Sequence, residues 1–269
     1  MGMRATRGCR SFILRYYTLA RFPRITHRSE IYPAACPASA HSLVRAELTK
    51  LRAHLSSCNV GEPEYNSCEY NHDEAMVEPP IIVGITGASG VVLAKRCIEE
   101  LAARERECIV LCTQAGATVW QQEQGAPFKE WVRHVRYVTS YGINDIAAPI
   151  ASGTYPTAGM VVVPCSMNTL AAMAHGLSGN LLERAVDVTL KEGRPLVVVP
   201  RETPLSVIHL RNLLTVAELG VKVVPPMPHF YARPERVEEI VDHIVGRMLV
   251  ALGVDKALPS TMQYGEGIR

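Results

Sequence analysis

Arg201 and Glu202 directly follow the apolar run Leu196–Pro200, and a charged pair in this position is hard to explain by packing alone. The run of valines predicts a strand that is buried on both faces. A charge at the end of such a strand must be paired or functional, because an unpaired buried ion is costly. The pattern therefore indicates either an ion pair that holds a loop or a guanidinium and a carboxylate that act on a ligand.

Two further cations, Arg184 and Lys191, stand seven residues apart in a segment with helical periodicity. This spacing places both side chains on one face of the helix. They could bind an anion there, or they could form a solvated surface with the nearby carboxylates of Glu183 and Asp187.

A glycine-rich segment, residues 84–90, follows the first apolar run of the main body and reads G-x-x-G-x-x-G. Such a turn, followed by a helix, offers free N–H groups and a positive dipole end to a phosphate, although it also serves as a tight turn without a ligand. The spacing differs from the dinucleotide fingerprint G-x-G-x-x-G. The second strand also ends in Cys112-Thr113 and not in an acid that could hold a ribose, so nicotinamide dinucleotides are disfavoured.

Two more polar segments follow predicted strands. Ser166, Asn168 and Thr169 stand at a strand-to-helix junction, where they can cap the helix or donate hydrogen bonds to a ligand. Residues 225–231 form a proline-rich loop that ends in Tyr231, and Arg247 lies on the polar face of the last predicted helix.

These residues are positioned by alternating strands and helices, which predict an α/β fold: a single Rossmann-like, doubly wound parallel sheet domain with flanking helices. Ligands of such sheets bind beyond the carboxyl ends of the strands. The expected strands are Ile81–Thr86, Cys108–Thr113, Gly159–Pro164, Leu196–Pro200 and Val221–Val224. The expected helices lie near 90–104, 114–124, 168–175, 180–192, 206–219 and 234–252.

Composition excludes several classes of protein. The 269 residues include 28 Lys and Arg against 26 Asp and Glu, and a net charge of +2 does not suggest a nucleic-acid binder. No apolar run reaches the length of about 18 residues that a membrane span needs. The eight cysteines form no C-x-x-C pair, and no His/Cys/Asp cluster has the spacing of metal ligands. We therefore expect buried, reduced thiols and no metal.

Residues 1–75 differ from the body, residues 76–269, because they show no sustained period. Residues 1–29 carry seven arginines and no acid, the composition of a mitochondrial transit peptide. No clear amphipathic helix emerges, however, and Met76 stands just before the first strand. We expect residues 1–75 to be a disordered extension, either a disposable leader or a mis-assigned start. We expect the protein to be cytoplasmic, or mitochondrial if the extension is a transit peptide.

Taken together, these segments resemble the UbiX-type flavin prenyltransferases, in the wider family of homo-oligomeric flavin-containing decarboxylase-like proteins. The resemblance covers residues 80–254. It is carried by ITGASG (85–90), SGT (152–154), PCSMNTLA (164–171), LLERAVDVTLKEGRPLVVVPRETPLS (181–206), PPMPHFY (225–231) and GR (246–247).

The resemblance implies a metal-independent prenyltransferase. Such enzymes attach the prenyl group of dimethylallyl phosphate to N5 and C6 of reduced FMN and pass the prenylated FMN to a UbiD-type decarboxylase. It also implies a homo-oligomer, commonly a dodecamer, with active sites shared between subunits. Two alternatives are a flavin-dependent decarboxylase of the same superfamily and an FMN-binding accessory subunit without catalysis.

Roles for individual residues also follow from the resemblance. It makes Glu202 the proton-handling group, Ser89 a group that polarises flavin N5, and Lys191 a third catalytic residue. The implied FMN-binding residues are Gly87, Ala88, Ser89, Thr113, Ser166, Met167, Asn168, Thr169 and Arg201. The implied residues around the prenyl phosphate are Lys191, Tyr231 and Arg247, with Arg184 and Ser152 nearby. Many family members have Lys where this chain has Asn168, which leaves the flavin's surroundings less positive.

Overall fold

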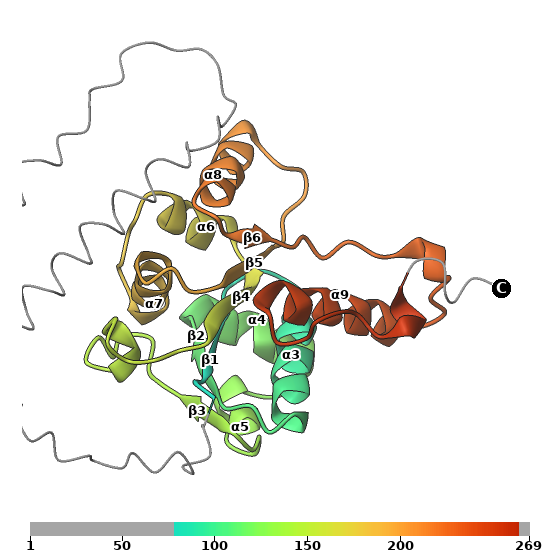
Figure 1. Cartoon of the computed structure of the whole chain (residues 1–269), viewed down its shortest axis with the longest axis horizontal. Coiled ribbons are helices and arrows are strands. Elements are labelled where there is room, and N and C mark those ends of the chain that lie inside the picture. The colour runs from blue at the N-terminus through green and yellow to red at the C-terminus, as the bar shows by residue number, and fades with distance from the viewer. Residues whose placement is uncertain (1–77, 264–269) are drawn as a thin grey trace, which may run out of the picture. The chain divides into compact units, whose positions relative to one another are not determined.

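Six parallel strands form one sheet in the order β3-β2-β1-β4-β5-β6 (Figure 1). The structure is a computed structural model, and it describes residues 78–263. The four central strands are runs of Val, Ile and Leu that are buried on both faces, as a sheet covered on both sides requires. The strands are β1 (Ile81–Ile85), β2 (Cys108–Cys112), β3 (Val138–Ser140), β4 (Gly159–Cys165), β5 (Leu196–Pro200) and β6 (Lys222–Val223).

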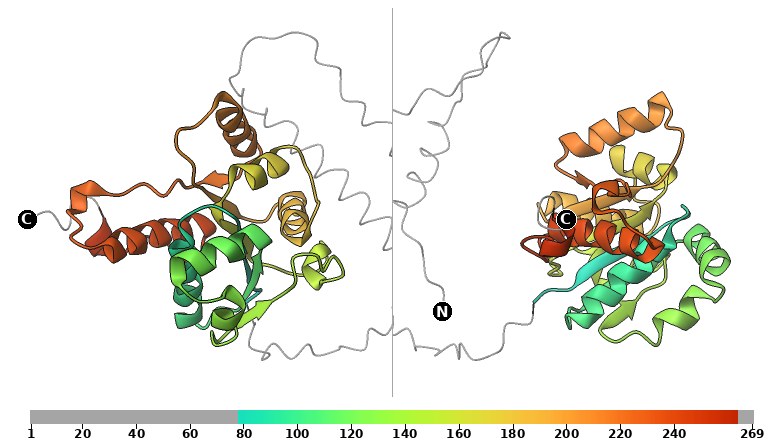
Figure 2. Two further views of the ribbon diagram at one scale, coloured as in Figure 1. Left: turned by 180° about the vertical axis from the view of Figure 1, so that it is seen from behind. Right: turned by 90° about the vertical axis from the view of Figure 1, so that its right-hand side faces the viewer.

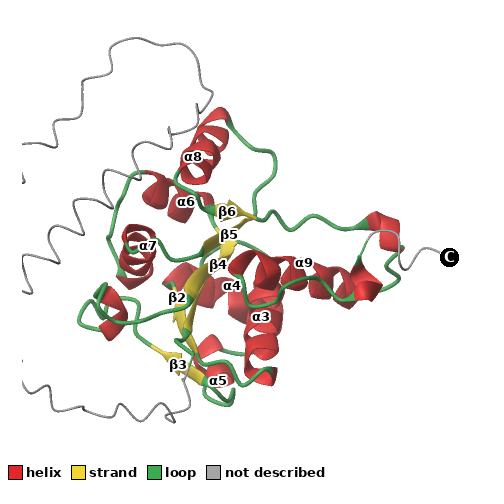
Figure 3. Cartoon of the chain, viewed as in Figure 1, coloured by secondary structure: helices red, strands yellow, loops and turns green. Residues whose placement is uncertain are grey.

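Helices cover both faces of the sheet (Figures 2 and 3). Alternate side chains of a strand point to opposite faces, so Val83 packs with the helices of one layer and Ile82 with those of the other. The first layer contains α3 (Val91–Ala103), α4 (Gln114–Gln124), α5 (Phe128–Val132) and α9 (Val237–Leu252). The second contains α6 (Met167–Ala174), α7 (Leu181–Lys191) and α8 (Val207–Glu218), together with the 3-10 turn η1 (Pro149–Ala151). This arrangement confirms the predicted doubly wound α/β domain.

The sequence prediction missed two short elements, β3 and α5. The strand β3 is three residues long, lies at the sheet edge and is only partly buried, so it has no apolar run that could reveal it. The helix α5 has five residues, too few to show a helical period. The last strand is also shorter than expected, because only Lys222 and Val223 pair with β5.

An arm leaves the sheet after β6. Figure 1 shows the chain running out to the 3-10 turn η2 (Phe230–Ala232) and returning along α9. The 16 residues of α9 span about 24 Å, more than the five residues of a central strand. A last turn, η3 (Ser260–Met262), follows α9. Within the described residues no helix is long and apolar enough to cross a membrane.

Candidate active site

Hydrogen bonds of the Thr86 side chain join the loops at the carboxyl ends of β1 and β4. The Thr86 hydroxyl, which is buried, donates to the Pro164 carbonyl at 2.7 Å and accepts from the Ser166 N–H at 2.8 Å. Because β1 and β4 are neighbours at the point where the strand order reverses, these loops border the crevice in which doubly wound sheets bind ligands.

The loops after β2 and β5 are fixed to the same edge. The Thr113 N–H donates to the Ile85 carbonyl at 3.0 Å, and the Arg201 N–H donates to the Cys165 carbonyl at 3.1 Å. The structure thus brings all nine of the predicted flavin residues to one edge of the sheet. They are Gly87, Ala88, Ser89, Thr113, Ser166, Met167, Asn168, Thr169 and Arg201, and Glu202 follows directly.

The loop after β1 offers three backbone donors. The N–H groups of Gly87, Ala88 and Ser89 donate to no group within residues 78–263. A Cβ on Gly87 would lie 2.5 Å from the Cβ of Ala115 on α4, so only glycine allows this close approach. The Ser89 side chain is exposed, whereas Ala88 is buried.

The first turn of α3 is not open to an anion, contrary to one possibility left open by the sequence. The Glu123 carboxylate of α4 accepts from the Gly90 N–H at 3.0 Å and from the Val91 N–H at 3.0 Å. The chain therefore supplies its own anion to the positive end of this helix. A flavin phosphate must use other donors, and the three N–H groups of residues 87–89 are available.

Helix capping accounts for part of the polar segments. Ser166 is the N-cap of α6, and its hydroxyl accepts from the Thr169 N–H at 3.4 Å. Thr113 is the N-cap of α4 and accepts from the Gly116 N–H at 3.0 Å. Asn168 is exposed in the first turn of α6, and the cap of this helix is Ser166 rather than Asn168. Capping and ligand binding coexist here, since a capping hydroxyl still has a hydrogen to donate.

Arg201 and Glu202 do not form an ion pair with each other. Both side chains are exposed, and Glu202 accepts from the Thr203 N–H at 2.9 Å. Within the described part of the chain the Arg201 guanidinium has no hydrogen-bond or ion-pair partner. The alternative in which this pair merely holds a loop is therefore wrong, and both groups can face a ligand at the end of β5.

The structure places Lys191 and Ser152 at the opposite edge of the sheet. Lys191 ends α7, five residues before β5 begins, and its Nζ lies 2.6 Å from Oε1 of Glu192. This hydrogen bond and charge lower the pKa of the Glu192 carboxyl. The Arg194 guanidinium donates to the Gly153 carbonyl at 2.7 Å and so ties the loop before β4, including Ser152, to the loop before β5.

Arg184, on α7, contacts the same loop before β4. Its Nε donates to the Ala151 carbonyl at 3.0 Å, and its Nη1 lies 2.6 Å from Oδ2 of Asp187. The pairing with Asp187 is the surface interaction that the sequence left open. Within one chain, therefore, Lys191 is separated from Glu202 by about the length of β5, whose five residues span roughly 16 Å.

Tyr231 and Arg247 lie on the arm, Tyr231 in η2 and Arg247 on α9, and both side chains are exposed. The Tyr231 hydroxyl lies 3.4 Å from Nε2 of His243, whose ring stacks on that of His229. The sequence analysis gave these two histidines no role. One feature of the sequence could have indicated a role for His243: it stands four residues before Arg247, one helical turn away on the same face.

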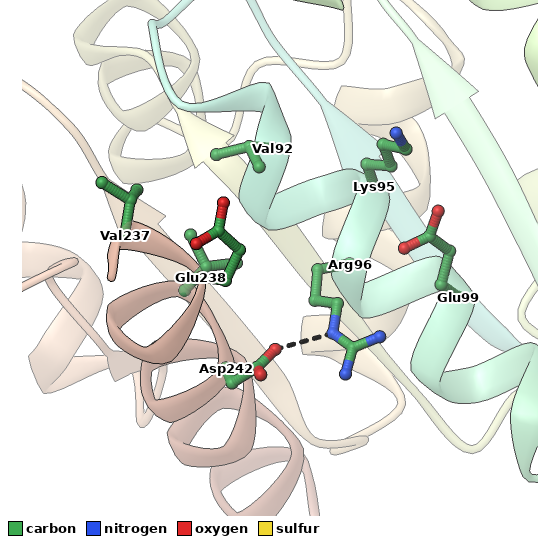
Figure 4. A pocket seen from close by; sticks show the side chains of 8 residues that line it. Val92, Lys95, Arg96, Glu99, Val237, Glu238 and Asp242 are labelled. Atoms are coloured by element: carbon green, nitrogen blue, oxygen red, sulfur yellow. Dashed lines mark hydrogen bonds and ion pairs between the residues drawn. The ribbon is translucent and has the colours of Figure 1, made fainter. Parts of the chain in front are cut away.

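A hollow of about 370 Å³ lies between α3 and α9 (Figure 4). An ion pair between Arg96 and Asp242, at 2.7 Å, crosses it. The lining residues are Val92, Lys95, Arg96, Glu99, Val237, Glu238, Val241 and Asp242. Three carboxylates against two cations do not suit a phosphate, and none of the predicted site residues lines this hollow.

The thiols take no part in this chemistry. Cys97, Cys108 and Cys165 are buried and Cys112 is partly buried, and burial raises the pKa of each thiol to about 12. All four cysteines of the described residues are unpaired, and the expected burial is confirmed for Cys97, Cys108 and Cys165. The other four cysteines lie outside the described residues, as does the rest of the 1–75 extension. Within residues 78–263 no group of three His, Cys, Asp or Glu side chains could hold a metal ion.

The residues at the carboxyl edge fit FMN. Backbone N–H groups of residues 87–89 can bind phosphate oxygens, and the Asn168 amide and the Arg201 guanidinium can bind the polar edge of a flavin. Ala88 and the partly buried Met167, which follow β1 and β4, can give an apolar contact for the ring. This donor set combines the anionic, polar and apolar contacts that FMN requires.

Comparisons with known proteins agree with this fit. The sequence model of the Flavoprotein family matches residues 69–249. The flavin prenyltransferase UbiX of Synechocystis is 47% identical over 189 residues, which cover 65% of this chain and 92% of that protein. The UbiX of Methanocaldococcus jannaschii is 42% identical over 179 residues, covering 66% of this chain and 95% of its own.

Solved structures show the same similarity. A dodecameric FMN-dependent UbiX-like decarboxylase from Escherichia coli O157:H7 is 42% identical, with a TM-score of 0.62 over 65% of this chain and 94% of that one. AnUbiX (PadA1), solved in complex with FMN and dimethylallyl pyrophosphate, is 40% identical, with a TM-score of 0.63 over 66% of this chain and 94% of that one. With the family match over most of the chain and these levels of identity, the chain belongs to the Flavoprotein family and, within it, to the UbiX-type flavin prenyltransferases.

Proposed function

We propose that this protein transfers the dimethylallyl group of dimethylallyl phosphate to N5 and C6 of reduced FMN. The observation that carries the proposal is the exposed Arg201–Glu202 pair after β5, whose side chains do not pair with each other, at the same edge of the sheet as the N–H groups of residues 87–89, which have no acceptor within residues 78–263. This edge offers a binding site for FMN with a carboxylate beside it. The identity to UbiX prenyltransferases, and the AnUbiX complex with FMN and dimethylallyl pyrophosphate, support the same reaction.

In this mechanism the loops after β1, β2 and β4 bind FMN, and Arg201 contacts it from β5. Reduced FMN, when bound, supplies the two nucleophilic atoms, N5 and C6. Ser89, exposed at the end of its loop, can donate a hydrogen bond to the N5 region. The second bond would join C6 to one carbon of the prenyl double bond while the other carbon takes up a proton and C6 loses one, and Glu202 would be the base that holds the proton from C6.

The prenyl phosphate requires cations, because breaking its C–O bond leaves negative charge on the phosphate oxygens. Lys191, Arg247 and the Tyr231 hydroxyl can stabilise this charge, with Arg184 and Ser152 beside them. Together they replace the charge that a metal ion could supply.

We further propose that each site is shared between subunits of a homo-oligomer. Lys191 and Ser152 lie at the amino edge of the sheet and Glu202 at the carboxyl edge, so one chain cannot bring them to the same ligand. A second copy can do so if its amino edge meets the carboxyl edge of the first. A dodecamer is the expected assembly, since the Escherichia coli relative is dodecameric.

Helix α8 offers a surface for such assembly. Only Asn212 and Val216 of this helix are buried, whereas Val207, Leu210 and Leu214, which share one face, are 61%, 51% and 60% exposed. A row of exposed apolar side chains on one helix marks an interaction surface. We expect Leu214→Glu to disrupt the oligomer and, with it, prenyl transfer. Light scattering after size-exclusion chromatography measures the mass, and Gln122→Glu on α4 is the control for the added charge. A Leu214→Glu protein that keeps both its mass and its activity would exclude α8 from the assembly.

The reaction itself is tested by anaerobic incubation of the protein with reduced FMN and dimethylallyl phosphate. We expect mass spectrometry of the released flavin to show the gain of one five-carbon prenyl unit. Unchanged FMN would reject this donor, and dimethylallyl pyrophosphate would then be tried. Unchanged FMN with both donors would favour the decarboxylase or the accessory subunit. A second assay distinguishes these two, because only the decarboxylase would release CO2 from cysteine-derived carboxylates.

We also propose that a UbiD-type decarboxylase receives the product, since prenylated FMN has no further use in the reaction above. For location we propose the cytoplasm, and the unpaired thiols of the described residues favour a reducing compartment. The mitochondrion is the alternative if residues 1–75 are a transit peptide. Mass spectrometry of the native N-terminus distinguishes the two.

A further inference from the structure

Two histidines on the arm form a stacked pair beside Tyr231. The rings of His229 and His243 lie 3.6 Å apart between centroids, with an angle of 17° between their planes. Tyr231 meets both rings edge to face, and its hydroxyl oxygen lies 3.4 Å from Nε2 of His243. The pair thus supports one of the residues that the proposed function assigns to the prenyl phosphate.

Burial decides which ring nitrogen carries the hydrogen. His229 and His243 are only 8% and 7% exposed, and Nδ1 of each ring is buried without a hydrogen-bond partner in the described part of the chain. A neutral imidazole carries one hydrogen, and a buried N–H without an acceptor is costly. We therefore place the hydrogen of His243 on Nε2, where it can be donated to the Tyr231 hydroxyl oxygen.

Burial is the main reason that both rings are neutral. Burial, the neighbouring His229 and the nearby Arg247 lower the pKa of His243 to about 4. Burial also lowers the pKa of His229, although the Glu239 carboxylate acts in the opposite direction. Neutral rings add no further positive charge beside Arg247, and the direction of the hydrogen bond to Tyr231 stays fixed.

We propose that the stacked pair is a positioning device for the prenyl phosphate, in which His243 donates its Nε2–H to Tyr231 and so directs the Tyr231 hydroxyl hydrogen toward the phosphate. His229 holds the His243 ring in place by stacking. Arg247, one turn after His243 on α9, supplies the charge. The proposal rests on the proposed function, because that function places the phosphate between Tyr231 and Arg247.

Two substitutions of His243 separate the hydrogen bond from the stacking. Phenylalanine keeps a flat ring against His229 but has no donor, whereas glutamine has an amide N–H near the position of Nε2 but no ring. The affinity for dimethylallyl phosphate is measured by titration calorimetry on protein loaded with oxidised FMN, so that binding is read without turnover. His134→Phe, an exposed histidine after α5, is the matched control.

We expect His243→Phe to raise the Kd for dimethylallyl phosphate about five- to tenfold, the effect of losing one hydrogen bond. His243→Gln should stay within about threefold of the unchanged protein, because its donor is retained. His134→Phe should have no effect. In turnover assays His243→Phe should raise KM more than it lowers kcat, which general destabilisation of the fold does not predict.

Several outcomes overturn the proposal. An unchanged Kd in His243→Phe, or an equal loss of affinity in His243→Gln and His243→Phe, would show that the donor does not act on the phosphate. Absence of binding by the unchanged protein would also refute it. If the unchanged protein binds dimethylallyl phosphate but does not prenylate FMN, the proposed function fails, while the Kd values still decide the role of His243.

Discussion

Replacing Glu202 by glutamine is expected to lower the rate of prenyl transfer by at least about a hundredfold, the low end of what general base catalysis contributes. The amide has the size of the carboxylate and its oxygen can still accept from the Thr203 N–H, as the carboxylate does at 2.9 Å. The loop at the end of β5 should therefore keep its conformation. What the variant loses is the ability to hold a proton taken from C6. Quenched samples analysed by mass spectrometry give the rate, and fluorescence titration gives the affinity for FMN.

The result is informative only if FMN still binds. We expect Glu202→Gln to bind FMN about as tightly as the unchanged protein, since Arg201 and the loop donors remain. Glu130→Gln, an exposed glutamate on α5, serves as the control for the chemical change and should leave the rate unaltered. A Glu202→Gln protein that prenylates FMN at the normal rate would remove the carboxylate from the mechanism. The departing phosphate would then be the remaining base.

The central strands could be predicted because the residues of each strand show the apolar pattern of a buried strand. The valine runs in β4 and β5 are buried on both faces, so packing demands apolar residues without interruption and the sequence shows them. The strand β3 needs no apolar run, because it lies at the edge of the sheet and is mostly exposed. Only its pairing with β2 makes it a strand. Such pairing depends on a neighbour far away in sequence, which no local pattern reveals.

The same distinction holds for the site. Loops that follow strands were placed correctly at one edge, because parallel strands end together. The Glu123 carboxylate at the start of α3 could not be foreseen, since it reaches Gly90 across 33 residues. Lys191 shows the converse case. Its likeness to a family motif suggested a role beside Glu202, but within one chain the direction of α7 carries it to the far edge of the sheet.

This separation leads to the second large effect: two inactive variants are expected to restore each other's activity when they assemble together. Lys191→Ala lacks a cation for the phosphate, and Glu202→Gln lacks the base, so neither should turn over alone. If each site takes Lys191 from one subunit and Glu202 from another, some sites in a mixed oligomer contain both native residues.

When equal amounts of the two variants assemble at random, half of the sites receive an intact Lys191 from the first subunit. Independently, half receive an intact Glu202 from the second subunit, so about a quarter of the sites should contain both and be active. The two variants are co-expressed with different tags, and oligomers that carry both tags are purified in tandem before the rate of prenyl transfer is measured. Co-expression of two differently tagged Lys191→Ala chains is the control and should stay inactive. If both residues instead served one site within a single chain, every site would lack one of them and the mixed oligomer would be as inactive as its parents. Activity near a quarter of the unchanged protein would therefore show that the two edges of the sheet meet between subunits.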